Sequence, residues 1–484
     1  MICISVTPSS RRLAAADLFN ASRQGDLIEL CLDNFKKLPD VGALLEVADK
    51  PVLVSCRRQR DGGQWSGSED DRIQLLRNAI VAGPAYVELD LAIADQIPRF
   101  GSTKRVINYT NLNGVLNQAA VDEVFEKCRK AKADVVKFTW LTETLDDAWP
   151  LLAAATQHRE IPVVGKGIGP GGLAFSLLGR RYGAPWIYAA LEKGMETFDG
   201  EATVAQLEDE YCWSDINRQM RFVGIVGQGT VENATTRILN AAFREFEVPV
   251  RCLPLIPGRP DRLRKMLEVL KIRALIINNG YSDAMRHLVD DRHHSVHNDG
   301  HMDLMTEKQG RWKARATLFD SINNATANVY KSDNWAQGRT ILVIGADSLS
   351  VSMAIRLQKL KAAVSLAAPS DNAAVRAAKE AGVRHVPWHS IYDLVTKGVV
   401  LTDASVKCGT GRGELNPSFL REGLTVIDLL TYPCESVIAE EAQLRGCSYV
   451  SPAMIFASQL QSQFNHLTGK SLPLEAFRKG LADS

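Results

Sequence analysis

The sequence lacks several features that would place it in a specialised class of protein. No apolar run approaches the ~18 residues of a membrane-spanning helix, and the nine cysteines show no Cys-x-x-Cys spacing. Basic residues (57) and acidic residues (56) balance to a net charge of +1, so neither nucleic acid nor an anionic membrane is an expected partner. The start MICISVTPSS has no basic segment and is not predicted to be a signal peptide. We expect a cytoplasmic protein with reduced thiols.

The composition that is present is that of an ordinary globular protein. Apolar residues make up 45% of the chain and charged residues 23%, which is typical of globular domains. A chain of 484 residues is too long for one hydrophobic core. Two to three domains are therefore predicted.

The first 210 residues alternate short apolar runs with helix-length segments. Eight such runs predict a (β/α)8 TIM barrel, at 2–6, 27–32, 51–56, 86–91, 105–109, 134–138, 161–165 and 186–191. Chemistry in such a barrel lies where the strands end. The polar residues at those ends are Glu29, Asp33, Arg57, Glu88, Asp90, Thr110 and Lys137.

The second half alternates strand and helix again from about residue 220. The strand TILVIG, at 340–345, precedes the helix-like SLSVSMAIRLQKLKA, and this predicts a parallel doubly wound, Rossmann-like sheet. We divide the chain into a barrel, a substrate subdomain and a nucleotide subdomain, at 1–215, 222–330 (completed by 460–484) and 331–459. Further predicted strands are 222–226, 250–255, 274–277, 363–367, 398–401 and 424–429, and predicted helices are 258–272, 282–289, 452–467 and 474–481.

Lys137, in DVVKFTW, is the strongest candidate for a nucleophile. Its neighbours are apolar, so burial should disfavour the charged amine, as Schiff-base chemistry requires. A structural lysine that pairs with Glu29 or Glu88 at the barrel mouth is the alternative. The residues alone leave both interpretations open.

The segments RVINYTNL, ADVVKFTW and IGPGGLAFSLLGRRYGAPWIYAAL resemble those that end strands five to seven of type I 3-dehydroquinate dehydratases. IELCLD, PVLVSCRRQRDGG, YVELDLA and ETFDGEAT fit the same family. The resemblance implies a reaction in which a lysine forms an imine with the ketone of 3-dehydroquinate and a histidine moves protons while water is lost. It places Lys137 at the imine lysine, Arg57 at a substrate-binding arginine and Asp61 at a family glutamate. Glu29, in IELCLD, is expected at the same substrate site.

Four elements of this family's pattern are altered, at five positions. Thr110 stands at the catalytic histidine, and a threonine hydroxyl cannot take up a proton near neutral pH. Phe175 and Ser176 replace a Ser-Arg pair whose arginine holds the substrate carboxylate, Glu201 replaces a glutamine, and Cys31 replaces an arginine. Together these changes argue against ordinary dehydratase activity.

The runs RFVGIVGQGTVENATTRILNAAF and VIDLLTYPCESVIAEEAQLRGCSYVSPAMIFASQLQSQFNHLTG resemble the opening and the close of shikimate dehydrogenases. The resemblance implies reduction of 3-dehydroshikimate by NADPH with a Lys–Asp pair. Asp320 falls on that aspartate, whereas Ser282 stands at the lysine. Asn233 and Thr235 fall on two carboxylate-binding serines, and Gln459 on a glutamine that touches substrate.

NADP is the cofactor that this resemblance implies, but its loop is altered. Of the family's Gly-Ala-Gly-Gly, only Gly345 remains, with Asp347 and Ser348 at the other two glycines. Glycines let the backbone approach a pyrophosphate over a helix N-terminus. The sequence APS, at 368–370, stands where an Asn-Arg-Thr run would hold a 2′-phosphate. These changes argue against binding of the cofactor.

A histidine-rich segment contains His293, His294, His297 and His301 among several aspartates. Such ligands can bind zinc or nickel, but a solvated loop is the favoured interpretation and no metal site is predicted.

Three functional hypotheses follow. The first is a bifunctional shikimate-pathway protein that keeps some of its family's activity or a related Schiff-base chemistry. The second is a catalytically degenerate homologue that serves as a binding or scaffold protein. The third is an unrelated enzyme on the same two folds, because fold does not fix function. The expected partner is a small keto or hydroxy acid, and the oligomeric state is left open, a homo-oligomer included.

Overall fold

The computed structural model describes residues 1–155, 160–277, 279–296, 301–411 and 413–482. The chain forms two compact units, one of residues 1–228 with 236–273 and the other of 229–235 with 274–484. The three-part division from the sequence stays a prediction. No helix in the described ranges has the length and apolar character needed to cross a membrane.

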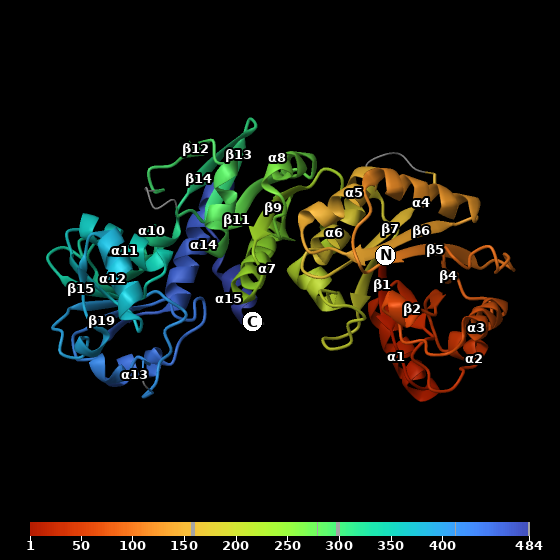
Figure 1. Ribbon diagram of the computed structural model, residues 1–484, viewed down its shortest axis with the longest axis horizontal. Coiled ribbons are helices and arrows are strands. Elements are labelled where there is room, and N and C mark those ends of the chain that lie inside the picture. The colour runs from red at the N-terminus through yellow and green to blue at the C-terminus, as the bar shows by residue number, and fades with distance from the viewer. Residues whose placement is uncertain (156–159, 278, 297–300, 412, 483–484) are drawn as a thin grey trace. The chain divides into compact units, whose positions relative to one another are not determined.

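Eight parallel strands form the barrel of the first unit, in the order β7-β6-β5-β4-β3-β2-β1-β8. The predicted TIM barrel is confirmed, with each strand near its expected place. Its helices lie around the outside of the strands (Figure 1). The strands are β1 (Ile2–Val6), β2 (Leu27–Cys31), β3 (Val52–Ser55), β4 (Tyr86–Asp90), β5 (Lys104–Asn111), β6 (Val135–Leu141), β7 (Val163–Ile168) and β8 (Ile187–Ala190), and the helices are α1 (Arg11–Gln24), α2 (Val41–Leu45), α3 (Glu69–Val81), α4 (Gln118–Lys130), α5 (Leu145–Ala155) and α6 (Gly172–Gly179).

An apolar floor closes the end of the barrel at which the strands begin. Nearly every strand contributes one inward side chain, because successive residues of a strand point to opposite sides. The floor consists of Cys3, Leu27, Leu53, Val106, Val135, Val164, Trp186 and Tyr188, with Tyr86 packed against them. This floor excludes water from one side of the barrel interior. The first unit also contains the parallel pair β9 (Arg221–Val226) and β10 (Val250–Leu255), and α8 (Pro260–Val269).

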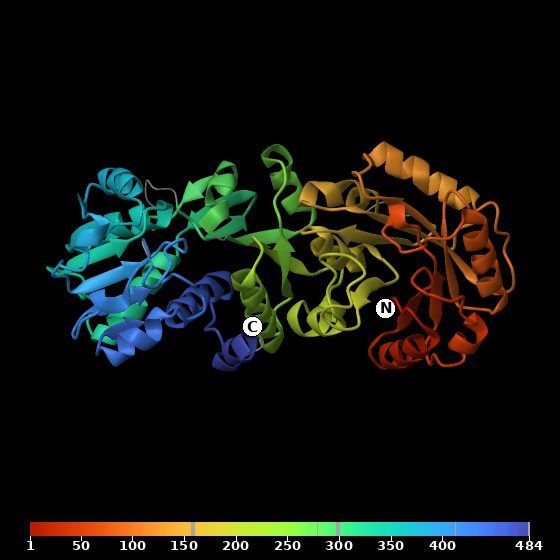
Figure 2. The same ribbon diagram turned by 60° about the horizontal axis from the view of Figure 1, so that its bottom comes forward.

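The second unit contains a six-stranded parallel sheet in the order β17-β16-β15-β18-β19-β20. Counted from β15, this is the order 3-2-1-4-5-6 of a dinucleotide-binding fold, so the predicted Rossmann-like subdomain is confirmed. Figure 2 shows the strands of this sheet side by side. Its elements are β15 (Thr340–Ile344), α11 (Ser348–Lys359), β16 (Ala363–Ala367), α12 (Asp371–Ala381), β17 (Arg384–His385), β18 (Gly398–Leu401), β19 (Thr425–Asp428), α13 (Ile438–Leu444) and β20 (Ser448–Val450).

An antiparallel hairpin precedes this sheet and was not expected from the sequence. β13 (Leu304–Lys308) pairs with β14 (Arg311–Arg315), and β11 (Ile272–Ile277) pairs with β13. Gln309 and Gly310 form the two-residue turn with φ of 54° and 79°, as hairpin turns of this length require. The remaining elements include β12 (Asp291–Arg292), α7 (Thr230–Glu245), α9 (Ser282–Met285), α10 (Leu318–Tyr330), α14 (Pro452–Thr468) and α15 (Leu474–Ala482).

Candidate active site in the barrel

A layer of polar side chains lies directly above the apolar floor, toward the carboxyl ends of the strands. Each of them comes two residues after a floor residue and therefore points inward as well. β2 supplies Glu29, β4 Glu88, β6 Lys137 and β7 Lys166, and each of the four is 5% exposed or less. Charged groups this deeply buried are costly unless they pair with one another. The layer is therefore expected to consist of ion pairs.

Lys137 is held between two carboxylates. Its Nζ donates to Glu88 Oε2 at 2.7 Å and lies 3.9 Å from Glu29 Oε1. Glu29 Oε2 accepts from the Ser5 hydroxyl at 2.6 Å, and Glu88 Oε1 accepts from Asn108 Nδ2 at 3.1 Å. This geometry fits both interpretations of Lys137. The lysine pairs with a glutamate, as a structural residue would, and its amine lies in the barrel interior, as a nucleophile requires.

The protonation of this trio differs from the expectation based on burial alone. Burial acts to lower the pKa of Lys137, but Glu88 and Glu29 outweigh it and raise that pKa above its ordinary value. Burial raises the pKa of Glu88. Burial acts in the same direction on Glu29, but Lys137, Arg57 and Lys166 outweigh it and lower its pKa. At rest Lys137 is therefore an ammonium group, and it must lose a proton before it can act as a nucleophile.

Lys166 is a second buried lysine, which the sequence analysis overlooked. Its Nζ donates to Glu201 Oε1 at 2.8 Å and to Thr197 Oγ1 at 2.7 Å. The alternating burial of Val163–Ile168 places it inward, two residues after Val164. That alternation was the available signal, but glycines on both sides of Lys166 obscured it.

Two aromatic rings separate the cations of the site. The Tyr188 ring centroid lies 4.4 Å from Lys137 Nζ and 4.7 Å from Lys166 Nζ. The Phe198 ring lies 4.8 Å from Lys166 Nζ and 5.0 Å from Arg57 Cζ. Ring faces attract cations at such distances, so the three cations are held around one interior space.

Arg57 has buried donors that no described residue satisfies. It is 5% exposed, and its Nη2 donates to Cys31 Sγ at 3.2 Å. Its Nε and Nη1, and also Glu29 Oε1, have no hydrogen-bond partner within the described part of the chain. Because buried polar atoms are nearly always paired, these groups mark a place for a polar ligand. Asp61, the other predicted residue here, pairs with Arg58 at 2.5 Å.

A buried carboxylate in the second unit, Asp303, accepts several hydrogen bonds. Its oxygens accept from Thr317 N at 2.8 and 2.9 Å and from Leu318 N at 2.7 Å, which places the carboxylate at the start of α10. Burial would raise the pKa of Asp303, but His301, with Nε2 3.8 Å from Asp303 Oδ2, and those backbone donors outweigh it and lower that pKa. Gln459 Nε2 donates to Asp303 Oδ2 at 3.2 Å. Sequence reasoning missed this residue because Asp303 stands outside the helix that it caps.

The other predicted residues of the second half are more scattered. Asp320 lies exposed in the first turn of α10. Gln459 contacts Asp303 instead. On α7, Asn233 is exposed and Thr235 is buried. Position 297, the third histidine of the histidine-rich segment, lies outside the described residues. Among the residues that are described, no three His, Cys, Asp or Glu side chains are placed to hold a metal ion.

The loop after β15 does not fit a pyrophosphate. Asp347 caps α11, with Oδ1 accepting from Ser350 N at 2.8 Å and from Ser350 Oγ at 2.5 Å. Its carboxylate thus occupies the helix N-terminus where a phosphate would bind. Gly345 has φ +146°, and an added Cβ would lie 2.4 Å from Ser350 Oγ and 2.7 Å from Thr402 Oγ1. This glycine is therefore required by packing as well.

Comparison with known proteins agrees with both halves of this description. Residues 2–218 match the family described as type I 3-dehydroquinase. The barrel half is thus similar to type I 3-dehydroquinases. Over 99% of the chain, and 83% of the relative, the sequence is 21% identical to the bifunctional 3-dehydroquinate dehydratase/shikimate dehydrogenase of Arabidopsis thaliana chloroplasts. It is 25% identical to a 3-dehydroquinate dehydratase of Dehalococcoides mccartyi over 43% of the chain and 94% of the relative.

The dehydroquinate dehydratase and shikimate dehydrogenase of S. pombe aligns with 99% of this chain and 98% of its own, at 16% identity and a TM-score of 0.46. The family match of the barrel and the Arabidopsis relative together confirm the predicted resemblance to a fusion of these two families.

Two of the departing positions in the barrel have structural partners. Thr110 Oγ1 accepts from Asn108 Nδ2 at 2.8 Å, and the same amide group donates to Glu88. The Phe175 ring fits against Gly165, where an added Cβ would lie 2.1 Å from it. It also stacks on Trp140 with centroids 6.4 Å apart. Phe175 therefore fills space in the barrel wall, and Thr110 joins the hydrogen-bond chain of the polar layer.

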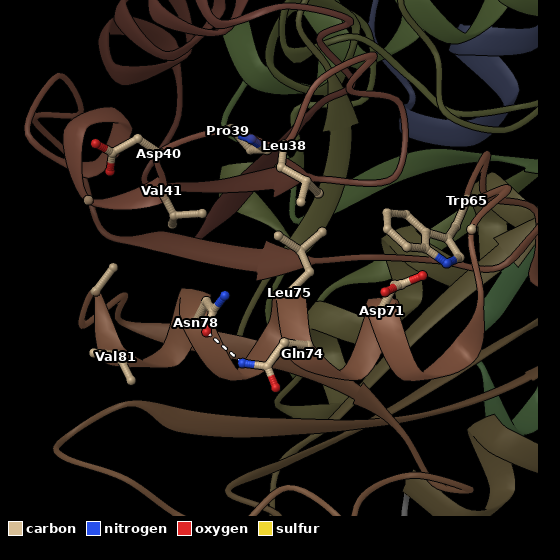
Figure 3. Close-up of a pocket in the computed structure, with 13 residues that line it drawn as sticks. Leu38, Pro39, Asp40, Val41, Trp65, Asp71, Gln74, Leu75, Asn78 and Val81 are labelled. Carbon is tan, nitrogen blue, oxygen red and sulfur yellow. Dashed lines mark hydrogen bonds between the residues drawn. The ribbon is translucent and has the colours of Figure 1, made fainter.

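A cavity of about 630 Å³ lies outside the barrel, where α3 and the segment around α2 meet. Figure 3 shows its lining, with Leu75 on α3 and Val41 at the start of α2. Its two carboxylates already serve helix starts, since Asp40 accepts from Ala43 N and Asp71 from the Ser68 hydroxyl. The cavity contains no residue of the polar layer, and we assign it no role.

Proposed function

We propose that the barrel forms an imine between Lys137 and the carbonyl of a small keto acid. The observation that carries this proposal is a buried amine beside two buried carboxylates and an arginine with unpaired donors. An amine held in such a place has an activating base at hydrogen-bond distance. The 3-dehydroquinase family and the bifunctional relative support a cyclic hydroxylated keto acid such as 3-dehydroquinate as the substrate class.

Arg57 is the residue that would bind the substrate carboxylate. Its Nε and Nη1 are buried donors without a hydrogen-bond partner among the described residues, and a carboxylate is the ligand that such a guanidinium group binds most strongly. Lys166 contributes positive charge but is already neutralised by Glu201 at 2.8 Å. Glu29 would stabilise the positive charge of the imine, because its lowered pKa keeps it ionised. Asp61 would act indirectly, by holding Arg58.

Loss of the family's histidine and arginine would make dehydration of 3-dehydroquinate slow. Thr110 and Ser176 stand at those positions, and general acid–base catalysis alone contributes ~10²–10⁴-fold. We therefore propose weak dehydratase activity rather than none, since the imine-forming lysine remains.

The second unit is proposed to have lost dinucleotide-dependent reduction and to act as a binding or scaffold domain. NADP is the cofactor of its family by resemblance, but Asp347 occupies the phosphate position at α11. The buried Asp303–Gln459 pair would still provide hydrogen bonds to a small hydroxy acid. The predicted site residues Asp320, Asn233 and Thr235 would lie at the edge of such a site and add weaker contacts to the ligand.

Carbon-13 NMR tests the imine proposal. A keto acid labelled at its carbonyl carbon should give a protein-bound resonance in the imine or carbinolamine region, because Lys137 converts the carbonyl. Lys137→Met should abolish the resonance. Lys166→Met, a matched change of another buried barrel lysine, should retain it. Equal spectra for the parent and Lys137→Met would refute the proposal.

A further inference from the structure

We infer that Glu88 is the catalytic acid and base of the barrel, in the role that the family gives to a histidine. This inference rests on the imine proposal and assigns the proton transfers that imine chemistry needs. It also names an activity, the exchange of protons at the carbon next to the carbonyl of a keto acid.

The position of Glu88 relative to the reacting nitrogen supports this role. Glu88 Oε2 lies 2.7 Å from Lys137 Nζ, whereas Glu29 Oε1 lies 3.9 Å away. Asn108 donates to the other oxygen of Glu88 at 3.1 Å and fixes the orientation of the carboxylate. A general base must be within hydrogen-bond reach of the proton it takes. Of the two carboxylates, Glu88 meets this condition.

The surroundings of the two carboxylates also separate their behaviour. Burial raises the pKa of Glu88, while Lys137 and Arg57 act against this rise and Glu29 adds to it. The pKa of Glu29 is lowered, because the three cations outweigh its burial. Two titratable groups whose pKa values are driven apart divide the roles of proton carrier and fixed charge. Glu88 is the carrier, and Glu29 is the fixed negative charge beside the iminium.

The other side chains of the interior are poorly suited to this role. Burial raises the pKa of Tyr188 well above its ordinary value, and it raises that of Cys31 to about 12. Lys166 donates to Glu201 and Thr197. Thr110 and Asn108 carry no group that titrates near neutral pH. Glu88 is the group in contact with Lys137 that can take up and return a proton.

The proton transfers can be followed atom by atom. Glu88 takes a proton from the Lys137 ammonium group, and the free amine nitrogen bonds to the ketone carbon. A proton passes from this nitrogen to the former ketone oxygen, which gives a neutral carbinolamine. The protonated Glu88 then gives its proton to the carbinolamine hydroxyl, which leaves as water while the C=N bond of the iminium forms.

Glu88 is then a carboxylate again and can act on carbon. It takes a proton from the carbon next to the iminium, the electrons of that C–H bond form a C=C bond, and the C=N electron pair moves to nitrogen. The enamine is neutral and Glu88 is protonated, so the charge of the site is unchanged. Return of the proton from solvent-equilibrated Glu88 replaces the original hydrogen. No oxidant, reductant or metal is required.

The test follows deuterium uptake from D₂O at the carbon next to the carbonyl of 3-dehydroquinate. Glu88→Gln keeps the shape and one oxygen acceptor toward Lys137 but cannot carry a proton. Exchange should fall by at least ~10²-fold, while the imine that borohydride traps after long incubation should stay within a few-fold of the parent. Glu88→Asp should recover part of the exchange. Thermal unfolding of each variant checks its fold.

The pH dependence provides a second readout with a definite sign. The ionised form of Glu88 is the base, so exchange by the parent should rise with pH through an apparent pKa above the ordinary glutamate value. Lys137, Glu29, Arg57, Tyr188 and Asn108 face this carboxylate, and Glu88→Gln leaves all of them in place. That rise should therefore be absent in the variant.

The outcomes separate the two proposals. A parent that neither traps an imine nor exchanges refutes the proposed function itself. If the Glu88→Gln variant exchanges deuterium at the parental rate, the role of Glu88 is overturned and the imine proposal stands. Loss of trapping in both Glu88→Gln and Glu88→Asp would show that Glu88 only positions Lys137, and this also overturns the inference.

Discussion

Replacing Thr110 by histidine and Ser176 by arginine together should raise the rate of 3-dehydroquinate dehydration by at least ~10²-fold over the parent. Thr110 ends β5 and is linked to Glu88 through Asn108, so an imidazole there would stand next to the Lys137 pair. The arginine would add the carboxylate clamp that the family has on α6. Steady-state kinetics of dehydroshikimate formation would measure the gain.

Two controls make this result specific. Thr110→Ser with Ser176→Arg adds the clamp without a proton carrier and should gain less than the full pair. The same pair in a Lys137→Met chain should gain nothing, because no imine forms. A parent that is already as fast as the repaired chain would contradict the expectation that Thr110 limits the reaction.

Neither NADPH nor NADH should bind the parent chain at sub-millimolar concentration. The Asp347 carboxylate lies at the start of α11, where it would repel a pyrophosphate and already accepts a hydrogen bond from Ser350 N. Like-charge contact and lost hydrogen bonds cost on the order of 1–3 kcal/mol each, or roughly 10²-fold in affinity. Asp347→Gly with Ser348→Gly should recover about that factor in calorimetric titration.

A matched change elsewhere controls for the loss of a helix cap. Asp40 caps α2 through Ala43 N in the barrel unit, so Asp40→Gly removes a comparable cap without touching the nucleotide loop. It should leave dinucleotide affinity unchanged. A parent dissociation constant in the low micromolar range would refute the loss of cofactor binding.

The regular parts of this fold could be predicted from the sequence because the geometry of strands and helices sets the length and spacing of their apolar residues. Alternating apolar runs and helix-length segments predicted the eight barrel strands and β15, β16, β18 and β19 of the second sheet. The short edge strands β17 and β20, of two and three residues, were not predicted. The hairpin of β13 and β14 was missed because its turn, Gln309-Gly310, lacks the Asn-Gly or Asp-Gly pair that normally marks such turns.

The site was predicted less completely, because its properties depend on partners from distant strands. Lys137 was identified from its apolar neighbours, but those neighbours suggested a lowered pKa. The structure shows the pairing with Glu88 on β4, 49 positions away, which had been the alternative interpretation, and the direction of the pKa shift reverses. The pairing of Lys166 with Glu201 spans 35 positions. No local pattern in the sequence specifies such pairs.

Borohydride trapping followed by peptide mass spectrometry tests the central claim most directly. The parent chain, incubated with 3-dehydroquinate and then reduced, should carry one covalent adduct on Lys137 and none on Lys166. The two lysines share the Tyr188 ring and differ in their carboxylate partners. Absence of any adduct across a panel of keto acids, or an adduct on Lys166 alone, would contradict the account.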